Sequence, residues 1–87
     1  MTAAETVVLL HGFTQTARSW DPVVAALGER YRVIAPDLRG HGAAADVRPV
    51  ELAAIRADVL ALTPDRFTLV GYSMGGRIAL DVALNGG

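Results

Sequence analysis

The segment Gly71-Tyr72-Ser73-Met74-Gly75 constrains the fold more than any other part of the chain. It places a serine between two glycines, directly after the apolar run 67–70 and directly before the helix-like run 74–85. This context is typical of a buried strand that passes into a helix through a very short turn. Side chains at the two glycines would collide with the neighbouring strand and helix, so we expect a strained turn with Ser73 at its apex.

Two similar strand-helix pairs precede this turn. The apolar runs 7–10 and 31–35 predict buried strands. We predict helices over 20–27, with Ser19 as the N-cap, and over 49–62, with Pro49 in the first helical position. This alternation predicts an α/β fold: a three-layer α/β/α unit built on a parallel sheet. With the first strand in the centre, the loop at His11 and the Ser73 turn meet at the carboxyl ends of the strands.

The predicted last helix, 74–85, is apolar on almost all sides, and only one polar line interrupts it. That line consists of Arg77, Asp81 and Asn85, which follow one another at helical spacing. A helix of this kind is expected to contact protein on several sides.

Composition narrows the classes of protein. The 87 residues form at most one domain, here 1–87, with 52% hydrophobic and 20% charged residues and a net charge of -1. Such a balance speaks against a nucleic-acid or anionic-membrane partner, and no apolar run reaches the ~18 residues of a membrane span. The chain has no cysteine and only two histidines, so we expect neither a metal site nor a cofactor. We expect a cytoplasmic protein; the sequence leaves its oligomeric state open.

The chemistry at Ser73 follows from its setting. A serine at such an apex can act as a nucleophile, because the start of the following helix directs N–H groups and positive dipole at the site. The Met74 amide is one natural donor to a developing oxyanion, and the Phe13 amide in the loop after the first strand is the other. Dinucleotide and phosphate-loop motifs cannot be drawn through residues 71–77.

Three segments together carry a family resemblance. They are 10–13 (LHGF), 35–42 (APDLRGHG) and 70–77 (VGYSMGGR), and in this order they resemble the signature segments of the α/β-hydrolase superfamily. The resemblance covers the amino-terminal half of that fold, so 1–87 is expected to be a partial domain. The family's triad acid and histidine come later in the chain than any residue present here. His11 and His41 do not occupy the place of that histidine, and Asp37 fits a turn or cap better than the triad acid.

Within the superfamily, the run 71–80 is similar to one branch, the 2-succinyl-6-hydroxy-2,4-cyclohexadiene-1-carboxylate synthases of menaquinone biosynthesis. The resemblance implies elimination of pyruvate from a small carboxylate substrate, with Ser73 as the catalytic serine. It implies an oxyanion hole at Phe13 and Met74, and substrate contacts by Tyr72, Arg77 and His11. Arg77 would grip a carboxylate; its alternative is an ion pair with Asp81 on the helix surface. Two other readings stay open: a carboxylic-ester hydrolase of the same superfamily, or an inactive truncated fragment.

Overall fold

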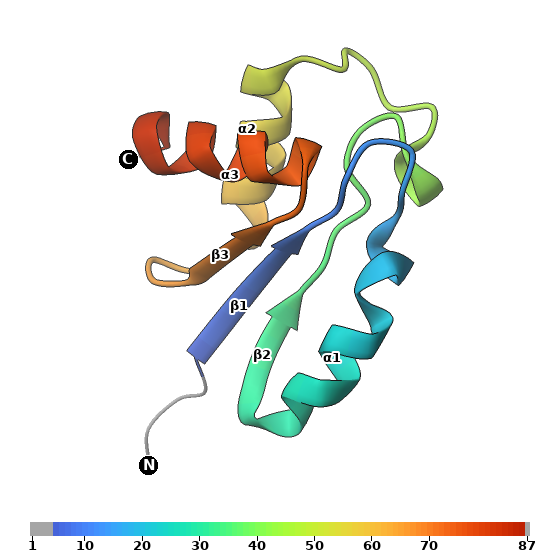
Figure 1. Cartoon of the computed structure of the whole chain (residues 1–87). Coiled ribbons are helices and arrows are strands. Elements are labelled where there is room, and N and C mark those ends of the chain that lie inside the picture. Colours follow the sequence, from blue (N-terminus) through green and yellow to red (C-terminus); the bar gives the residue numbers. More distant parts are fainter. Residues whose placement is uncertain (1–4, 87) are drawn as a thin grey trace.

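The computed structural model describes residues 5–86. Each predicted strand and helix is present (Figure 1). The strands are β1 (Glu5–Leu10), β2 (Tyr31–Ile34) and β3 (Thr68–Gly71), and the helices are α1 (Asp21–Leu27), α2 (Leu52–Leu62) and α3 (Met74–Asn85). Short 3₁₀ turns cover Ala17–Trp20, Gly28–Arg30 and Gly42–Ala44.

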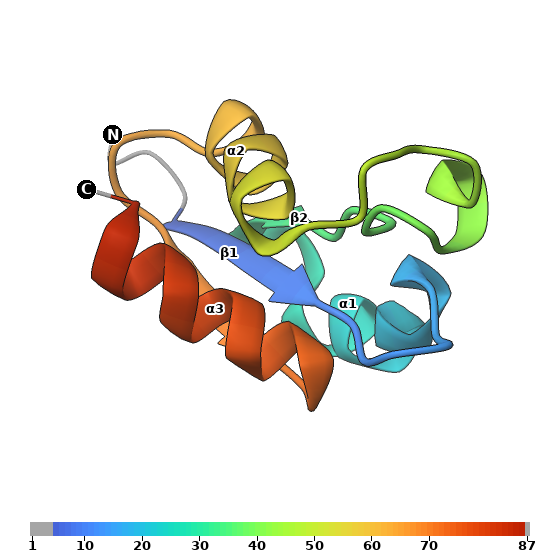
Figure 2. The same cartoon turned by 90° about the horizontal axis from the view of Figure 1, so that it is seen from above.

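The three strands form one parallel sheet in the order β2-β1-β3, so the prediction of a central first strand is confirmed. Val8 of β1 lies opposite Ile34 of β2 and Leu69 of β3 in the register. The chain moves outward from β1 to β2 and then back across β1 to β3. Right-handed crossovers in opposite directions place their helices on opposite faces of the sheet. Figure 2 accordingly shows β1 between α1 on one side and α2 and α3 on the other.

The hydrophobic core lies between the sheet and the α2–α3 pair. Val8 and Leu10, which point to one face of β1, are fully buried there. The rest of this cluster comes from the loop after β2 and from the two helices: Leu38, Ile55, Val59, Ile78 and Val82. Val7 and Leu9 point to the opposite face and are buried as well, on the side of α1. The expected three-layer α/β architecture is therefore present.

Two predicted helix starts are wrong. Ser19 does not cap α1; it lies inside the preceding 3₁₀ turn, where its N–H donates to the Thr16 carbonyl and the Thr16 hydroxyl serves as the cap. Pro49 lies ahead of α2, which begins at Leu52. The Pro49 carbonyl instead accepts a hydrogen bond from Arg39, a contact with a loop ten residues earlier in the chain. Both helices therefore begin later than predicted, α1 at Asp21 and α2 at Leu52.

Only part of the apolar surface of α3 is covered by the rest of the described chain. Its buried residues Ile78 and Val82 face the core, whereas Leu80 and Leu84 are exposed. Asp81 of its polar line is bound by Arg56 of α2, with both carboxylate oxygens within 3.0 Å of Nη1. Within residues 5–86, no helix is long and apolar enough to cross a membrane.

Candidate active site

Ser73 stands at the turn between β3 and α3 in a strained backbone conformation. Its φ is 55° and its ψ is -112°, a combination that non-glycine residues rarely adopt. Holding such a conformation costs on the order of 1–3 kcal/mol, which the surrounding structure must offset. The residue is exposed, so the turn lifts its hydroxyl out of the sheet toward solvent.

The two glycines of the turn are required by close packing. A Cβ atom on Gly71 would overlap the main chain of Gly75, and a Cβ on Gly75 would overlap the carbonyl of Leu10. The turn is also tied to the end of β1, because the Tyr72 N–H donates to the Leu10 carbonyl oxygen at 3.0 Å. The predicted reason for these glycines, collision with the neighbouring strand and helix, is confirmed.

Within residues 5–86, the main-chain N–H groups of Met74 and Phe13 have no hydrogen-bond acceptor. Met74 begins α3, where the first N–H groups of a helix lack intrahelical partners. The next amides of α3 are engaged: Gly75 N–H donates to the Tyr72 carbonyl, and Gly76 N–H to the Ser73 carbonyl. The second free amide belongs to Phe13, in the loop after β1. These are the two amides expected to form an oxyanion hole.

The side chains around the turn present apolar surface and one cation. Phe13 and Tyr72 are 69% and 59% exposed, and the Tyr72 ring lies beside Gly12 of the loop after β1. Arg77, one turn into α3, is exposed and forms no ion pair in the part of the chain that the structure describes. The alternative pairing of Arg77 with Asp81 does not occur, because Arg56 binds Asp81.

His11 was expected to contact substrate, but its ring is buried with 0% exposure. The Leu38 N–H donates to its Nε2 at 3.0 Å, and its Nδ1 lies 2.9 Å from the Gly12 carbonyl oxygen. Both ring nitrogens are thus engaged by the main chain. This arrangement argues against the expected substrate contact by His11 and indicates a role inside the scaffold.

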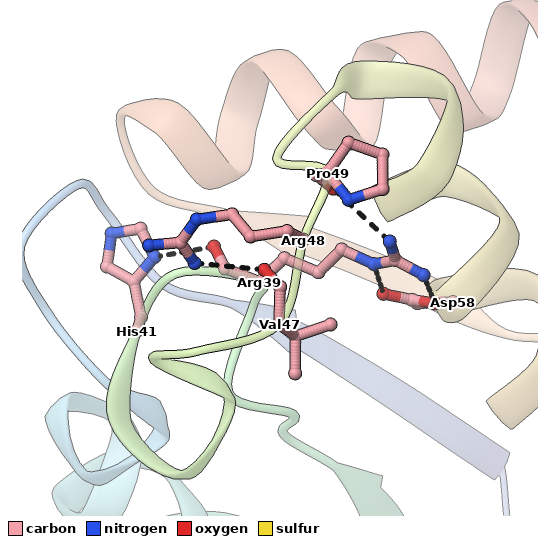
Figure 3. Close-up of polar contacts among 6 residues, drawn as sticks. All are labelled: Arg39, His41, Val47, Arg48, Pro49 and Asp58. Carbon is pink, nitrogen blue, oxygen red and sulfur yellow. Dashed lines mark hydrogen bonds and ion pairs between the residues drawn. The ribbon is translucent and has the colours of Figure 1, made fainter.

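His41 is also buried and packs against His11, with ring centroids 5.0 Å apart. Its Nδ1 lies 3.1 Å from the Arg39 carbonyl oxygen (Figure 3). Among residues 5–86, neither histidine is hydrogen-bonded to Ser73. The same residues contain no cluster of three side chains that could hold a metal ion.

Asp37 connects two loops, as its predicted turn or cap role requires. One carboxylate oxygen accepts from the Ala17 N–H at 2.7 Å and the other from the Ala43 N–H at 2.9 Å. These hydrogen bonds, first the one from Ala17 and then the one from Ala43, hold the pKa of the Asp37 carboxyl below its usual range. With both oxygens occupied, Asp37 shapes the loops that surround the site.

An ion pair that the sequence did not reveal fixes the loop after β2. Arg39 binds Asp58 of α2 through Nε at 2.6 Å and Nη2 at 3.0 Å, a bidentate contact (Figure 3). The hydrogen bonds of this pair lower the pKa of Asp58 and raise that of Arg39. In the sequence, Asp58 is one of the polar residues of the predicted helix 49–62. No local pattern joins it to an arginine 19 residues earlier.

Comparison with known proteins supports the resemblance to the α/β-hydrolase superfamily independently of the geometry. A family model described as "Alpha/beta hydrolase family" matches residues 7–87. A pimeloyl-[acyl-carrier protein] methyl ester esterase of Aliivibrio salmonicida is 37% identical over 78 residues, which cover 90% of this chain and 30% of that protein. A "putative carbamate hydrolase RutD" of Yersinia enterocolitica is 40% identical over 89 residues, which cover 95% of this chain and 32% of the relative.

Solved structures agree with the sequence comparison. The structure of a "putative epoxide hydrolase" from Pseudomonas aeruginosa, in a mutant form, superposes with a TM-score of 0.81 at 31% identity. The match covers 95% of this chain and 31% of that one. The chain therefore spans about a third of the length of the proteins it matches. By its sequence, its topology and its glycine-flanked serine turn, the chain belongs to the α/β-hydrolase family.

Proposed function

We propose that these residues carry the nucleophile and oxyanion half of a carboxylic-ester hydrolase. The observation that carries the proposal is the conformation of Ser73, held at φ 55° between two glycines that admit no side chain. Strain of this kind persists only where the surroundings impose it, and it is concentrated at functional sites.

In the proposed reaction, the Ser73 hydroxyl attacks the ester carbonyl carbon. The carbonyl oxygen becomes an oxyanion, which accepts hydrogen bonds from the Phe13 and Met74 amides. Each such donor stabilises the transition state by about 2.7–4 kcal/mol. The C–O bond to the alcohol then breaks as the base returns the proton to the departing oxygen. Water, deprotonated by the same base, attacks the acyl-serine, and the acid and free Ser73 are released. The proton taken from Ser73 needs a general base, and both histidines of the chain are buried and bound to main-chain atoms. The base therefore has to come from outside these residues.

We further propose that the substrate carries an anionic group. Arg77 offers a guanidinium that no carboxylate within residues 5–86 occupies, and a guanidinium binds a carboxylate through two parallel hydrogen bonds. Phe13 and Tyr72 expose their rings, which supply apolar surface. A short dicarboxylic acid esterified at one end combines a carboxylate for the guanidinium with a carbon chain for the apolar surface. Tyr72 and Arg77 thus keep their expected roles as substrate contacts, and His11 is assigned a different one.

The sequence favoured a synthase that eliminates pyruvate, with ester hydrolysis as the alternative. The relatives described above are named as an ester hydrolase and a carbamate hydrolase, so they support the alternative better. The free guanidinium of Arg77 suits an anionic substrate in either reaction. We therefore place hydrolysis first.

Two assays separate the reactions. The protein is incubated with mono-p-nitrophenyl succinate, with p-nitrophenyl butyrate and, separately, with the pyruvate-releasing substrate of the synthase. We expect Ser73-dependent release of p-nitrophenol and faster reaction of the succinate ester than of the butyrate ester, which has the same chain length but no carboxylate. Release of pyruvate without ester cleavage would overturn the proposal in favour of the synthase. Imidazole in the buffer supplies an external base. Because imidazole also cleaves the esters without the protein, the rate with Ser73→Ala is subtracted.

A further inference from the structure

The bond between Asn85 and Gly86 lies at the carboxyl end of α3, the end opposite to Ser73. Asn85 is the last residue of the helix and is exposed to water, and Gly86 follows it. An asparagine in front of a glycine loses ammonia readily, because the glycine nitrogen carries no neighbouring side chain that would hinder its approach to the asparagine amide. Asn85 is the only asparagine of the chain, and Gln15 is the only glutamine. Any loss of a side-chain amide can therefore be assigned to one residue.

The reaction uses only the chain itself and water. The Gly86 main-chain nitrogen attacks the Cγ atom of Asn85 and closes a succinimide ring. Its proton passes to the amide nitrogen of Asn85, which leaves as ammonia. Water then opens the ring at either of its carbonyl carbons. One opening gives aspartate, and the other gives isoaspartate, in which the main chain runs through the former side chain.

The helical backbone holds Asn85 in a conformation in which this ring cannot close. The Gly86 N–H donates to the Val82 carbonyl oxygen at 2.8 Å, so the attacking nitrogen is engaged as a donor. Ring closure requires this nitrogen to swing toward the Asn85 side chain, away from the helical ψ of about -42°. The Gly86 N–H must therefore leave Val82 before the reaction can begin.

The Asn85 side chain is held as well, by the ion pair between α2 and α3. Its Nδ2 donates to Oδ1 of Asp81 at 2.9 Å. The same oxygen accepts a hydrogen bond from Nη1 of Arg56 at 3.0 Å, and the other oxygen of Asp81 lies 2.9 Å from that nitrogen. The Asp81 side chain is only 11% exposed. The acceptor of the Asn85 amide is thus fixed to the neighbouring helix.

We propose that Asn85–Gly86 is a site of spontaneous deamidation, and that the Arg56–Asp81 ion pair slows the reaction. The product weakens the contact that delays its formation. A carboxylate at position 85 lies one helical turn from Asp81 and at the carboxyl end of α3, so both the like charge and the helix dipole disfavour it. It also lacks the N–H that Asn85 donates to Asp81. Deamidation therefore loosens α3 from α2.

Peptide mass spectrometry of the purified chain during long incubation at mildly alkaline pH measures the modified fraction. We expect Asn85 to be the modified residue and to yield both aspartate and isoaspartate, which an isoaspartyl methyltransferase labels. Asn85→Gln should stay unmodified, because the longer side chain has to close a larger and less favourable ring. Aspartate without isoaspartate would contradict ring closure by the Gly86 nitrogen.

Two aspartate variants distinguish the specific contact from general loosening of the fold. Asp81→Ala removes both the acceptor of the Asn85 amide and the partner of Arg56. Asp58→Ala removes the other ion pair of α2 and leaves the contacts of Asn85 in place. We expect D81A to deamidate about threefold to tenfold faster than the original chain, the effect of one lost hydrogen bond on a rate, and D58A to keep the original rate. Equal rates in D81A and the original chain, or equal acceleration in D58A, would overturn the proposal.

The chain unfolded in guanidinium chloride supplies the reference rate. We expect it to deamidate faster than the folded chain and faster than D81A, and equal rates in the folded and unfolded chain would refute the protection. If D81A reaches the unfolded rate, Arg56→Ala decides, because it frees Asp81 from α2 but keeps the acceptor of the Asn85 amide. R56A should then lie between the folded and unfolded rates, and an original rate in R56A would contradict the role of the ion pair.

Discussion

The Gly75 main chain packs directly against the carbonyl of Leu10, and the contact leaves no room for a Cβ atom. This contact joins the start of α3 to the end of β1, and so it brings the serine turn beside the loop that carries Phe13. The site is therefore assembled around a main-chain contact between a strand and a helix that only glycine permits. Ser73 and Phe13, 60 residues apart in the chain, depend on it.

Replacing Gly75 by alanine should destabilise the fold strongly. The added methyl group would meet main-chain atoms of Leu10 and His11, which cannot move aside as a flexible side chain does. Overpacking typically costs about 1–3 kcal/mol, and we expect the upper end or beyond. Urea denaturation measures the change.

Gly76→Ala is the matched control for that experiment. Its Cβ would lie 3.5 Å from the Gly71 carbonyl oxygen, an ordinary contact, and alanine favours a helix by up to about 1 kcal/mol over glycine. We expect neutral or improved stability. Equal losses for the two variants would show that general helix packing, and not the Leu10 contact, dominates.

Ser73→Gly should be more stable than Ser73→Ala. Both variants lose the hydroxyl, but only glycine adopts φ near 55° and ψ near -112° without steric cost. Since backbone strain of this kind costs about 1–3 kcal/mol, we expect a difference of about 1 kcal/mol after the entropy of the more flexible unfolded glycine chain is subtracted. Parallel thermal and urea unfolding of the two proteins provides the comparison. If alanine were the more stable of the two, the turn would not be strained.

The pH dependence of stability should reveal Asp37. Its folded-state pKa is lowered below the 3.8 of a free aspartate side chain, first by the hydrogen bond from the Ala17 N–H and then by the one from the Ala43 N–H. A group with a lowered folded pKa stabilises the fold above its unfolded pKa, and this stabilisation disappears as the pH falls through the folded pKa. We expect Asp37→Asn to cost about 1 kcal/mol near neutral pH, in line with the loss of charge-assisted hydrogen bonds, and progressively less below pH 3.8.

Asp65→Asn serves as the control for Asp37, because Asp65 lies on an exposed turn. Chemical denaturation at several pH values, with both variants and the original chain, measures the difference. A cost of Asp37→Asn that stayed constant through acid pH would contradict the assigned hydrogen bonds.

The Arg56–Asp81 pair should stabilise the packing of α2 on α3. Its side chains are 26% and 11% exposed, compared with 19% and 42% for Arg39 and Asp58. The two arginines are similarly exposed, but Asp81 is far better shielded from water and salt than Asp58, and this makes the first pair the more durable one at high ionic strength. In double-mutant cycles with Arg→Gln and Asp→Asn, we expect a coupling of about 1 kcal/mol for Arg56–Asp81 that persists in 1 M salt. Loss of that coupling in salt to the same degree as for Arg39–Asp58 would refute the difference.

The features predicted correctly are those that depend on residues adjacent in the sequence. A continuous apolar run such as 7–10 indicates a buried strand, and two glycines beside Ser73 indicate a turn too tight for side chains. The features predicted wrongly depend on partners far along the chain. The Pro49 carbonyl accepts a hydrogen bond from Arg39, and the His11 ring accepts one from the N–H of Leu38, 27 residues later. A sequence pattern gives no sign of which main-chain atoms a buried imidazole will meet.

The most direct test of the central claim is to trap the nucleophile. The chain is treated with a fluorophosphonate, with imidazole as external base, and the modified residue is located by peptide mass spectrometry. We predict one covalent adduct, on Ser73, that is absent in Ser73→Ala and forms more slowly while an excess of mono-p-nitrophenyl succinate is present as a competing substrate. An adduct on another residue, or equal labelling of the Ser73→Ala variant, would contradict the assignment of Ser73 as the nucleophile of an ester hydrolase.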